Sequence, residues 1–213
     1  SVMKKEPYWL DTAKIKSFPA LNRDISVDVL VIGAGITGIT AAYLLKQSGL
    51  SVALIERERA AIRDTGHTTA HLTYVTDTGL DTLQRKFGAD HAEAVWDAGA
   101  AAIDEIEAIV VREAIDCKFA RVPGYLHAPI DCDSKNDNQE LKKIACLAQQ
   151  FGFEATFLES IPHFGVSGIR FADQARFHPR KYLAHLIQMI PGDRSHVYEK
   201  TAAGKFDAKR RRV

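Results

Sequence analysis

The chain has 213 residues, 46% hydrophobic and 26% charged, which is typical of one large globular domain or one domain with a smaller insertion. Its 28 Lys and Arg residues nearly balance 27 Asp and Glu residues, and the net charge is +1. This balance gives no electrostatic reason to expect nucleic acid or a membrane surface as a partner. The basic run at 209–212 is expected to be a solvated tail rather than a binding patch.

The cysteines are odd in number and widely spaced, at Cys117, Cys132 and Cys146. No CxxC and no Cys/His ligand spacing occurs, so the sequence predicts neither a zinc site nor an iron–sulfur site. Free thiols favour a reducing compartment. The first seven residues lack an apolar stretch, and no apolar run approaches the ~20 residues of a spanning helix. We therefore expect a soluble cytoplasmic protein without a metal.

The first predicted elements follow an irregular leader, residues 1–24. The apolar, β-branched run at 27–32 predicts a strand buried on both faces, as in parallel sheets. Residues 36–48 predict a helix that Gly49 ends, and 52–55 predict a second strand. Strand, helix and strand within about 30 residues have the size of one βαβ unit.

The elements predicted after this βαβ unit are one long helix and then a mixture of short strands and helices. Asp90 as N-cap, with Glu93 three residues later, predicts a helix to about residue 115. Its expected buried face consists of Ala94, Val95, Ala98, Ala102, Ile106 and Ile109. The next segment predicts a separate lobe inserted into the first domain. Its expected elements are short strands at 119–122, 124–127 and 155–158, a polar loop at 131–138 and a helix around 141–148. A helix that begins at Pro179 has core-facing residues at Leu183, Leu186, Ile187 and Ile190, and residues 196–200 predict a strand that returns to the parallel sheet.

The segment Gly33-Ala34-Gly35-Ile36-Thr37-Gly38 matches GxGxxG. Gly33 permits the tight turn out of the strand, Gly35 lets backbone approach a pyrophosphate, and Gly38 allows close packing of helix and strand. Glu56 ends the next strand about 20 residues further on, where it can bind a ribose 2′-hydroxyl and repel a 2′-phosphate. A glycine turn that only joins strand to helix is the alternative. The motif favours FAD or NAD over NADP, and its spacing does not separate FAD from NAD.

Several segments together resemble the FAD-dependent oxidoreductases of the D-amino-acid-oxidase (DAO) type, from residue 7 to about 201. The segments are 28–38, 55–57, 65–71, the leader at 8–12, and 177–183. The resemblance implies FAD as cofactor. It places the pyrophosphate at Gly33, Ala34, Gly35, Thr37 and Gly38, and the adenosine ribose at Glu56 with Arg57 beside it. It also implies that the loop from Thr65 to His71 lies along the flavin, with Thr68 and Thr69 near the ring. The site residues it assigns in this loop are Thr65, Gly66, His67, Thr68 and Thr69. It identifies no catalytic side chain.

The fold expected is α/β: a Rossmann-like parallel-sheet FAD/NAD(P)-binding domain with an inserted smaller α+β lobe. We expect the FAD-binding domain at 25–116 and 173–203, a substrate-type lobe at 117–172, and a basic tail at 204–213. Members of the resembled family are considerably longer. We therefore expect part of the isoalloxazine half of the site to be lost, with self-association through an incomplete sheet.

The function expected is oxidation of a small amine or amino-acid-like substrate by hydride transfer to flavin. One alternative is a truncated, non-catalytic dinucleotide-binding remnant, and another is an NAD-dependent dehydrogenase. His67 and His71 are four apart, but no carboxylate or cysteine is spaced to complete a metal site. Tyr125 and Arg176 either meet a substrate or, as we favour, are ordinary packing and surface residues.

Overall fold

The structure is a computed structural model that describes residues 6–127, 130, 135–210 and 213. The described residues divide into two compact units, and unit 2 is inserted into unit 1 in sequence. Unit 1 comprises residues of 1–69, 115–117 and 178–213, and unit 2 those of 70–114 and 118–177. No helix in the described ranges is both long and apolar enough to cross a membrane.

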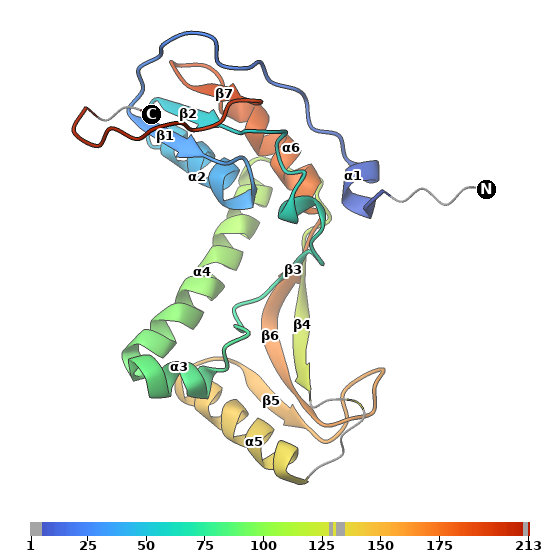
Figure 1. The fold of residues 1–213 in the computed structure, drawn as a ribbon. Coiled ribbons are helices and arrows are strands. Elements are labelled where there is room, and N and C mark those ends of the chain that lie inside the picture. The colour runs from blue at the N-terminus through green and yellow to red at the C-terminus, as the bar shows by residue number, and fades with distance from the viewer. Residues whose placement is uncertain (1–5, 128–129, 131–134, 211–212) are drawn as a thin grey trace. The chain divides into compact units, whose positions relative to one another are not determined.

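Unit 1 is built on a parallel sheet of three strands in the order β1-β2-β7 (Figure 1). Val29 pairs with Val52, and Ile55 pairs with Tyr198, so the strand predicted to return to the parallel sheet does so. The elements of this unit are α1 (Tyr8–Thr12), β1 (Val29–Ile32), α2 (Ile36–Gln47), β2 (Val52–Ile55), the 3₁₀ turn η1 (Asp64–Gly66), α6 (Pro179–Met189) and β7 (His196–Tyr198). The α/β fold expected from the sequence is confirmed.

The two strands of the predicted βαβ unit differ in burial. All four residues of β2, the middle strand, are buried. The expectation that β1 is buried on both faces is wrong: its residues are only partly buried, and Ile32 is 49% exposed. The reason is its place in the sheet, because among the described strands β1 pairs only with β2.

Helices α2 and α6 pack against each other in unit 1. Helix α2 buries Ile39, Ala42 and Tyr43, and it ends before Gly49, whose φ of +89° is the left-handed conformation that follows many helices. Helix α6 begins at Pro179 as predicted, with His178 as its N-cap residue. The four residues predicted to face the core from this helix, at 183, 186, 187 and 190, are all buried.

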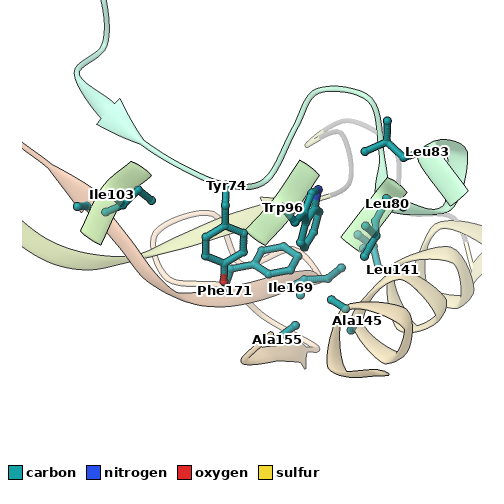
Figure 2. Close-up of a cluster of buried hydrophobic side chains, with 13 residues drawn as sticks. Tyr74, Leu80, Leu83, Trp96, Ile103, Leu141, Ala145, Ala155, Ile169 and Phe171 are labelled. Carbon is teal, nitrogen blue, oxygen red and sulfur yellow. The ribbon is translucent and has the colours of Figure 1, made fainter. Parts of the chain in front are cut away.

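Unit 2 consists of an antiparallel sheet and three helices. Strand β6 is its centre, because β3, β4 and β5 all pair with it. Aromatic side chains fill the core: the ring centroid of Trp96 lies 5.5 Å from that of Tyr74 and 5.6 Å from that of Phe171 (Figure 2). The elements are β3 (His71–Leu72), α3 (Leu80–Phe87), α4 (Ala89–Arg112), β4 (Ala120–His127), α5 (Lys135–Gln150), β5 (Ala155–Leu158) and β6 (Gly168–Arg176).

Helix α4 differs from the expectation in three respects. Its N-cap residue is Gly88 rather than Asp90, because a glycine with φ of +89° joins α3 to α4. Its buried residues are Ala92, Trp96, Ile103 and Ile109, so the predicted face is wrong except at Ile109. Because Trp96 and Ile103 join the core of unit 2, α4 belongs to that unit rather than to a segment 25–116. Of the polar loop predicted at 131–138, residues 131–134, and Cys132 with them, lie outside the described residues, and 135–138 are the first turn of α5 rather than a loop.

Candidate dinucleotide site

The glycine loop joins the end of β1 to the first turn of α2 in unit 1. Gly33 has φ of +96°, which a residue with a Cβ adopts only under strain. A Cβ built on Gly38 would lie 1.8 Å from the carbonyl oxygen of Gly33, so this position admits only glycine. Gly35 is the N-cap residue of α2 and has no side chain with which to cap it. The helix thus presents its N-terminal N–H groups and partial positive charge at the surface of the loop.

The carboxylate of Glu56 lies against this loop. Its Oε2 accepts a hydrogen bond from the backbone N–H of Ala34 at 2.9 Å, and its Oε1 accepts one from that of Glu58 at 2.9 Å. Glu56 follows the middle strand directly, and its own N–H donates to the Tyr198 carbonyl at 2.9 Å. The sheet therefore fixes the backbone from which the carboxylate reaches the glycine loop.

A second loop, residues 60–69, adjoins the glycine loop. The Ala61 N–H donates to the carbonyl of Ala34 at 2.9 Å, and the Ile36 N–H donates to Thr65 Oγ1 at 3.3 Å. A Cβ on Gly35 would lie 3.5 Å from the same Thr65 oxygen, an ordinary van der Waals distance. The structure therefore brings together the glycine loop, Glu56 and Thr65.

The other residues that the family resemblance assigned to the site lie near the glycine loop, Glu56 and Thr65. Thr37 is exposed in the first turn of α2, and Thr68 and Thr69 are exposed where the second loop ends. Gly66 is buried, and the exposed His67 donates from Nδ1 to the carbonyl of Arg63 at 2.9 Å. Arg57 is exposed as well. The roles of these residues toward a cofactor stay predictions.

This geometry fits a dinucleotide pyrophosphate: a left-handed glycine, a helix whose N-cap residue is a glycine without a side chain, and a carboxylate at the neighbouring strand end. A family model for FAD dependent oxidoreductases, DAO, matches residues 28–213. The chain belongs to the DAO family. FAD is therefore the cofactor that this DAO chain is built to hold, and its adenosine and pyrophosphate would lie along the glycine loop and Glu56.

Two curated relatives are similar to this DAO chain. The putative Rieske 2Fe-2S iron-sulfur protein YhfW of Bacillus subtilis is 36% identical over 200 residues, which are 93% of this chain and 38% of that protein. The gamma-glutamylputrescine oxidoreductase of Escherichia coli is 27% identical over 143 residues, which are 67% of this chain and 31% of that protein. The DAO chain thus spans about a third of each relative's length.

Solved structures share the fold. The L-amino acid deaminase from Proteus vulgaris matches with a TM-score of 0.62 at 15% identity, over 88% of this chain and 43% of that one. At that identity the likeness establishes the fold and nothing finer.

Several residues that hold the second loop in the DAO chain were not singled out by the sequence analysis. The guanidinium of Arg180, which is 6% exposed, donates to the carbonyls of Ala13 at 3.0 Å and Ala61 at 2.6 Å. The buried carboxylate of Glu199 accepts from the Ala60 N–H and from Arg59 Nη1, both at 2.8 Å. Arg180 lies in the family-like segment 177–183 and Glu199 in the strand predicted at 196–200, but neither side chain was assigned a role.

His178 accepts one hydrogen bond that only its neutral form can accept. Its Nδ1 accepts from the Lys181 N–H at 3.3 Å, which caps α6. Its Nε2 lies 2.9 Å from Thr12 Oγ1, whose own proton goes to the Tyr8 carbonyl, so Nε2 carries the hydrogen. Burial lowers the pKa of His178 below its ordinary 6.5, and the positive charges of Lys181 and Arg180 act in the same direction.

We expect the free energy of unfolding to fall as the pH drops below about 6.5. Because the pKa of His178 is lower in the folded chain than in the unfolded one, the unfolded chain takes up the proton first, and the cap is lost on protonation. His178→Asn keeps a capping acceptor that does not titrate. Denaturant unfolding between pH 5 and 8 should therefore show a steeper acid loss in the wild type, on the order of 1 kcal/mol. Parallel pH profiles would contradict the role given to His178.

His67 and His71 do not share a helix face, because His67 follows the 3₁₀ turn and His71 lies in β3. Among the described residues, no group of three or more His, Cys, Asp or Glu side chains could hold a metal ion. Tyr125 is 39% exposed in β4, and Arg176 is exposed at the end of β6. Both lie in unit 2, and within the part of the chain that the structure describes nothing around them assigns either to a substrate.

Unit 2 has a pocket of about 320 Å³ beside Arg121. Arg121 Nη2 lies 2.6 Å from both Asp104 Oδ1 and Glu107 Oε2, and Nη1 donates to the carbonyl of Asp173 at 3.1 Å. Burial lowers the pKa of Arg121, but the hydrogen bonds to Asp104 and Glu107 outweigh it and raise the pKa overall. The guanidinium is engaged within the protein, so the pocket offers it to no anionic ligand.

Proposed function

We propose that this chain carries the FAD-binding part of an oxidoreductase that acts on a small amine or amino-acid-like substrate. The observation that carries the proposal is the glycine loop with Glu56 bonded to the Ala34 N–H, within a span that matches the FAD dependent oxidoreductase family. Two similar proteins, a gamma-glutamylputrescine oxidoreductase and an L-amino acid deaminase, are named for nitrogen-containing substrates, which supports a substrate of that class.

The proposed roles follow from the chemistry of each group. The N–H groups at the start of α2 would donate to the pyrophosphate, and Glu56 would accept from the adenosine ribose. Thr65, Thr68 and Thr69 would lie along the flavin. Bound FAD would supply the acceptor for a hydride from a C–H bond beside an amine nitrogen, whose N–H proton is released as the C=N bond forms. Because the cofactor provides the redox chemistry, the protein's part is to bind and orient.

The test is an absorption spectrum of the purified chain after FAD has been added and the excess removed. We expect visible flavin bands that stay with the protein. Glu56→Ala should weaken FAD binding about tenfold, the scale of hydrogen bonds to a charged group. Glu58→Ala is the matched control, because Glu58 is the next acidic side chain and its carboxylate bonds to Arg63 instead.

Three outcomes separate the candidate functions. If the wild-type chain retains flavin and Glu56→Ala binds it more weakly, the proposal is supported and a screen of amines is justified. A chain that stays colourless favours the non-catalytic remnant. Binding of NADH without flavin would favour a dehydrogenase.

We also propose that the chain self-associates through β1. Its outer edge has no strand partner among the described residues, and Ile32 is 49% exposed there. Sedimentation at several protein concentrations measures this directly, and a monomer throughout would refute it.

A further inference from the structure

The leader binds the loop that adjoins the glycine loop, although it lies outside the residues 28–213 that the family model matches. Its helix α1 lies beside α6 in unit 1 (Figure 1). The indole Nε1 of Trp9 donates to the carbonyl of Thr68 at 2.7 Å, across 59 positions of sequence. This is a short hydrogen bond to the backbone of the segment that is expected to lie along the flavin.

The next leader residue contacts the same loop. A Cβ built on Gly66 would lie 3.1 Å from Leu10 Cδ2 and 3.2 Å from the carbonyl oxygen of Ala61. The backbone at Gly66 is therefore enclosed between the leader on one side and the loop's own start on the other. A side chain at this position would displace one of them.

Two buried groups fasten the rest of the leader. Arg180 joins Ala13 to Ala61 through their carbonyls, so one guanidinium bonds to the leader and to the loop. Glu199 does the same with its two oxygens: Oε2 accepts from the Phe18 N–H at 2.9 Å, and Oε1 accepts from the Ala60 N–H. Arg180 and Glu199 therefore each form hydrogen bonds to both the leader and the loop.

We propose that residues 9–13 form a clamp that holds residues 61–68 in the conformation FAD requires, with Trp9 as its positioning residue. Trp9 would act through the Thr68 backbone and not by touching the cofactor. The clamp itself rests on the contacts above, whereas its effect on FAD rests on the proposed function. If the loop is already ordered before FAD binds, less conformational entropy is lost on binding, and the affinity for FAD is higher.

The test compares Trp9→Phe with Tyr8→Phe in the full 213-residue chain. Trp9→Phe keeps a ring beside His178, whose centroid lies 4.8 Å from that of Trp9, and removes the N–H donor. Tyr8→Phe is the matched control, since it removes one polar group from the neighbouring, 65% exposed ring. Hydrogen exchange at residues 64–69, without FAD, reports the clamp, and flavin fluorescence titration reports FAD affinity.

We expect Trp9→Phe to speed exchange at 64–69 on the order of fivefold, the equivalent of one ordinary hydrogen bond, and to weaken FAD binding by a similar factor. Exchange in β2 and α2 should stay at wild-type rates, and Tyr8→Phe should change neither measurement. Unchanged exchange at 64–69 would overturn the clamp. Faster exchange throughout unit 1 would overturn it too, because Trp9 would then only stabilise the fold.

The two proposals fail separately. If the wild-type chain takes up no FAD while Trp9→Phe still loosens residues 64–69, the proposed function is wrong and the clamp stands. If FAD binds with equal affinity to wild type and Trp9→Phe although the loop is loosened, the positioning role of Trp9 is wrong and the proposed function stands.

Discussion

Gly38→Ala is expected to abolish retention of FAD and to lower the free energy of unfolding by about 3 kcal/mol. The added methyl group would lie 1.8 Å from the carbonyl oxygen of Gly33 and 3.1 Å from its carbonyl carbon. Both atoms are backbone, so no side-chain rotation relieves the overlap, and α2 has to move away from β1. The glycine loop opens as a result. Denaturant unfolding of the FAD-free chain measures the loss of stability, and a flavin titration measures the loss of binding.

Gly35→Ala is the matched control for that prediction. Its methyl group would meet only Thr65 Oγ1, at 3.5 Å, and Gly35 has φ of −86°, which alanine adopts without strain. We expect the FAD-free stability to stay within about 0.5 kcal/mol of the wild type. FAD binding should still weaken, since the methyl group occupies the place where a pyrophosphate approaches the backbone. Equal stability of the two variants would show that helix and strand tolerate a Cβ at Gly38.

Glu199→Ala is expected to cost about 3 kcal/mol of unfolding free energy, the scale for leaving buried hydrogen-bond donors without their acceptor. The carboxylate is 1% exposed and accepts from Arg59 Nη1 and from the N–H groups of Ala60 and Phe18. Removing it leaves the N–H groups of Ala60 and Phe18 without this acceptor, whereas Arg59 keeps its hydrogen bond to the Ile15 carbonyl. Thermal and denaturant unfolding of wild type and variant measure the difference.

Lys200→Ala is the matched control. Lys200 is the next residue after Glu199, and its side chain is exposed. It should change stability by about 0.5 kcal/mol or less. Glu199→Gln should fall between the two, since an amide keeps one acceptor oxygen and loses the charge. A Glu199→Ala chain as stable as Lys200→Ala would mean that water replaces the lost acceptor, and the burial assigned to this carboxylate would be wrong.

The glycine loop was predictable because its signals are local. The apolar runs, Gly33 to Gly38, and the acidic residue after the second strand all lie within one βαβ unit, and the structure has β1, α2 and β2 there. Pro179 likewise marked the start of α6 through its own backbone. Each of these signals depends on a residue and its neighbours within one turn or one strand.

The features that the sequence did not reveal depend on distant partners. Helix α4 has apolar residues on more than one side, and only the aromatic core around Tyr74 and Phe171 selects the face with Trp96. The strand β6 was missed because Asp173, with φ of +56°, and Gln174 interrupt its apolar pattern. The partners of Glu199 lie 139 to 181 positions away, a separation that no local pattern encodes.

Those separations have a consequence for the chain as it leaves the ribosome. The glycine loop and Glu56 emerge early, but the loop that adjoins them gains Arg180 and Glu199 only after all of unit 2 has been translated. Contacts so distant in sequence form late and slowly. Until unit 2 has been translated, the nascent chain therefore has the glycine loop and Glu56 without the two side chains that hold the adjoining loop in place.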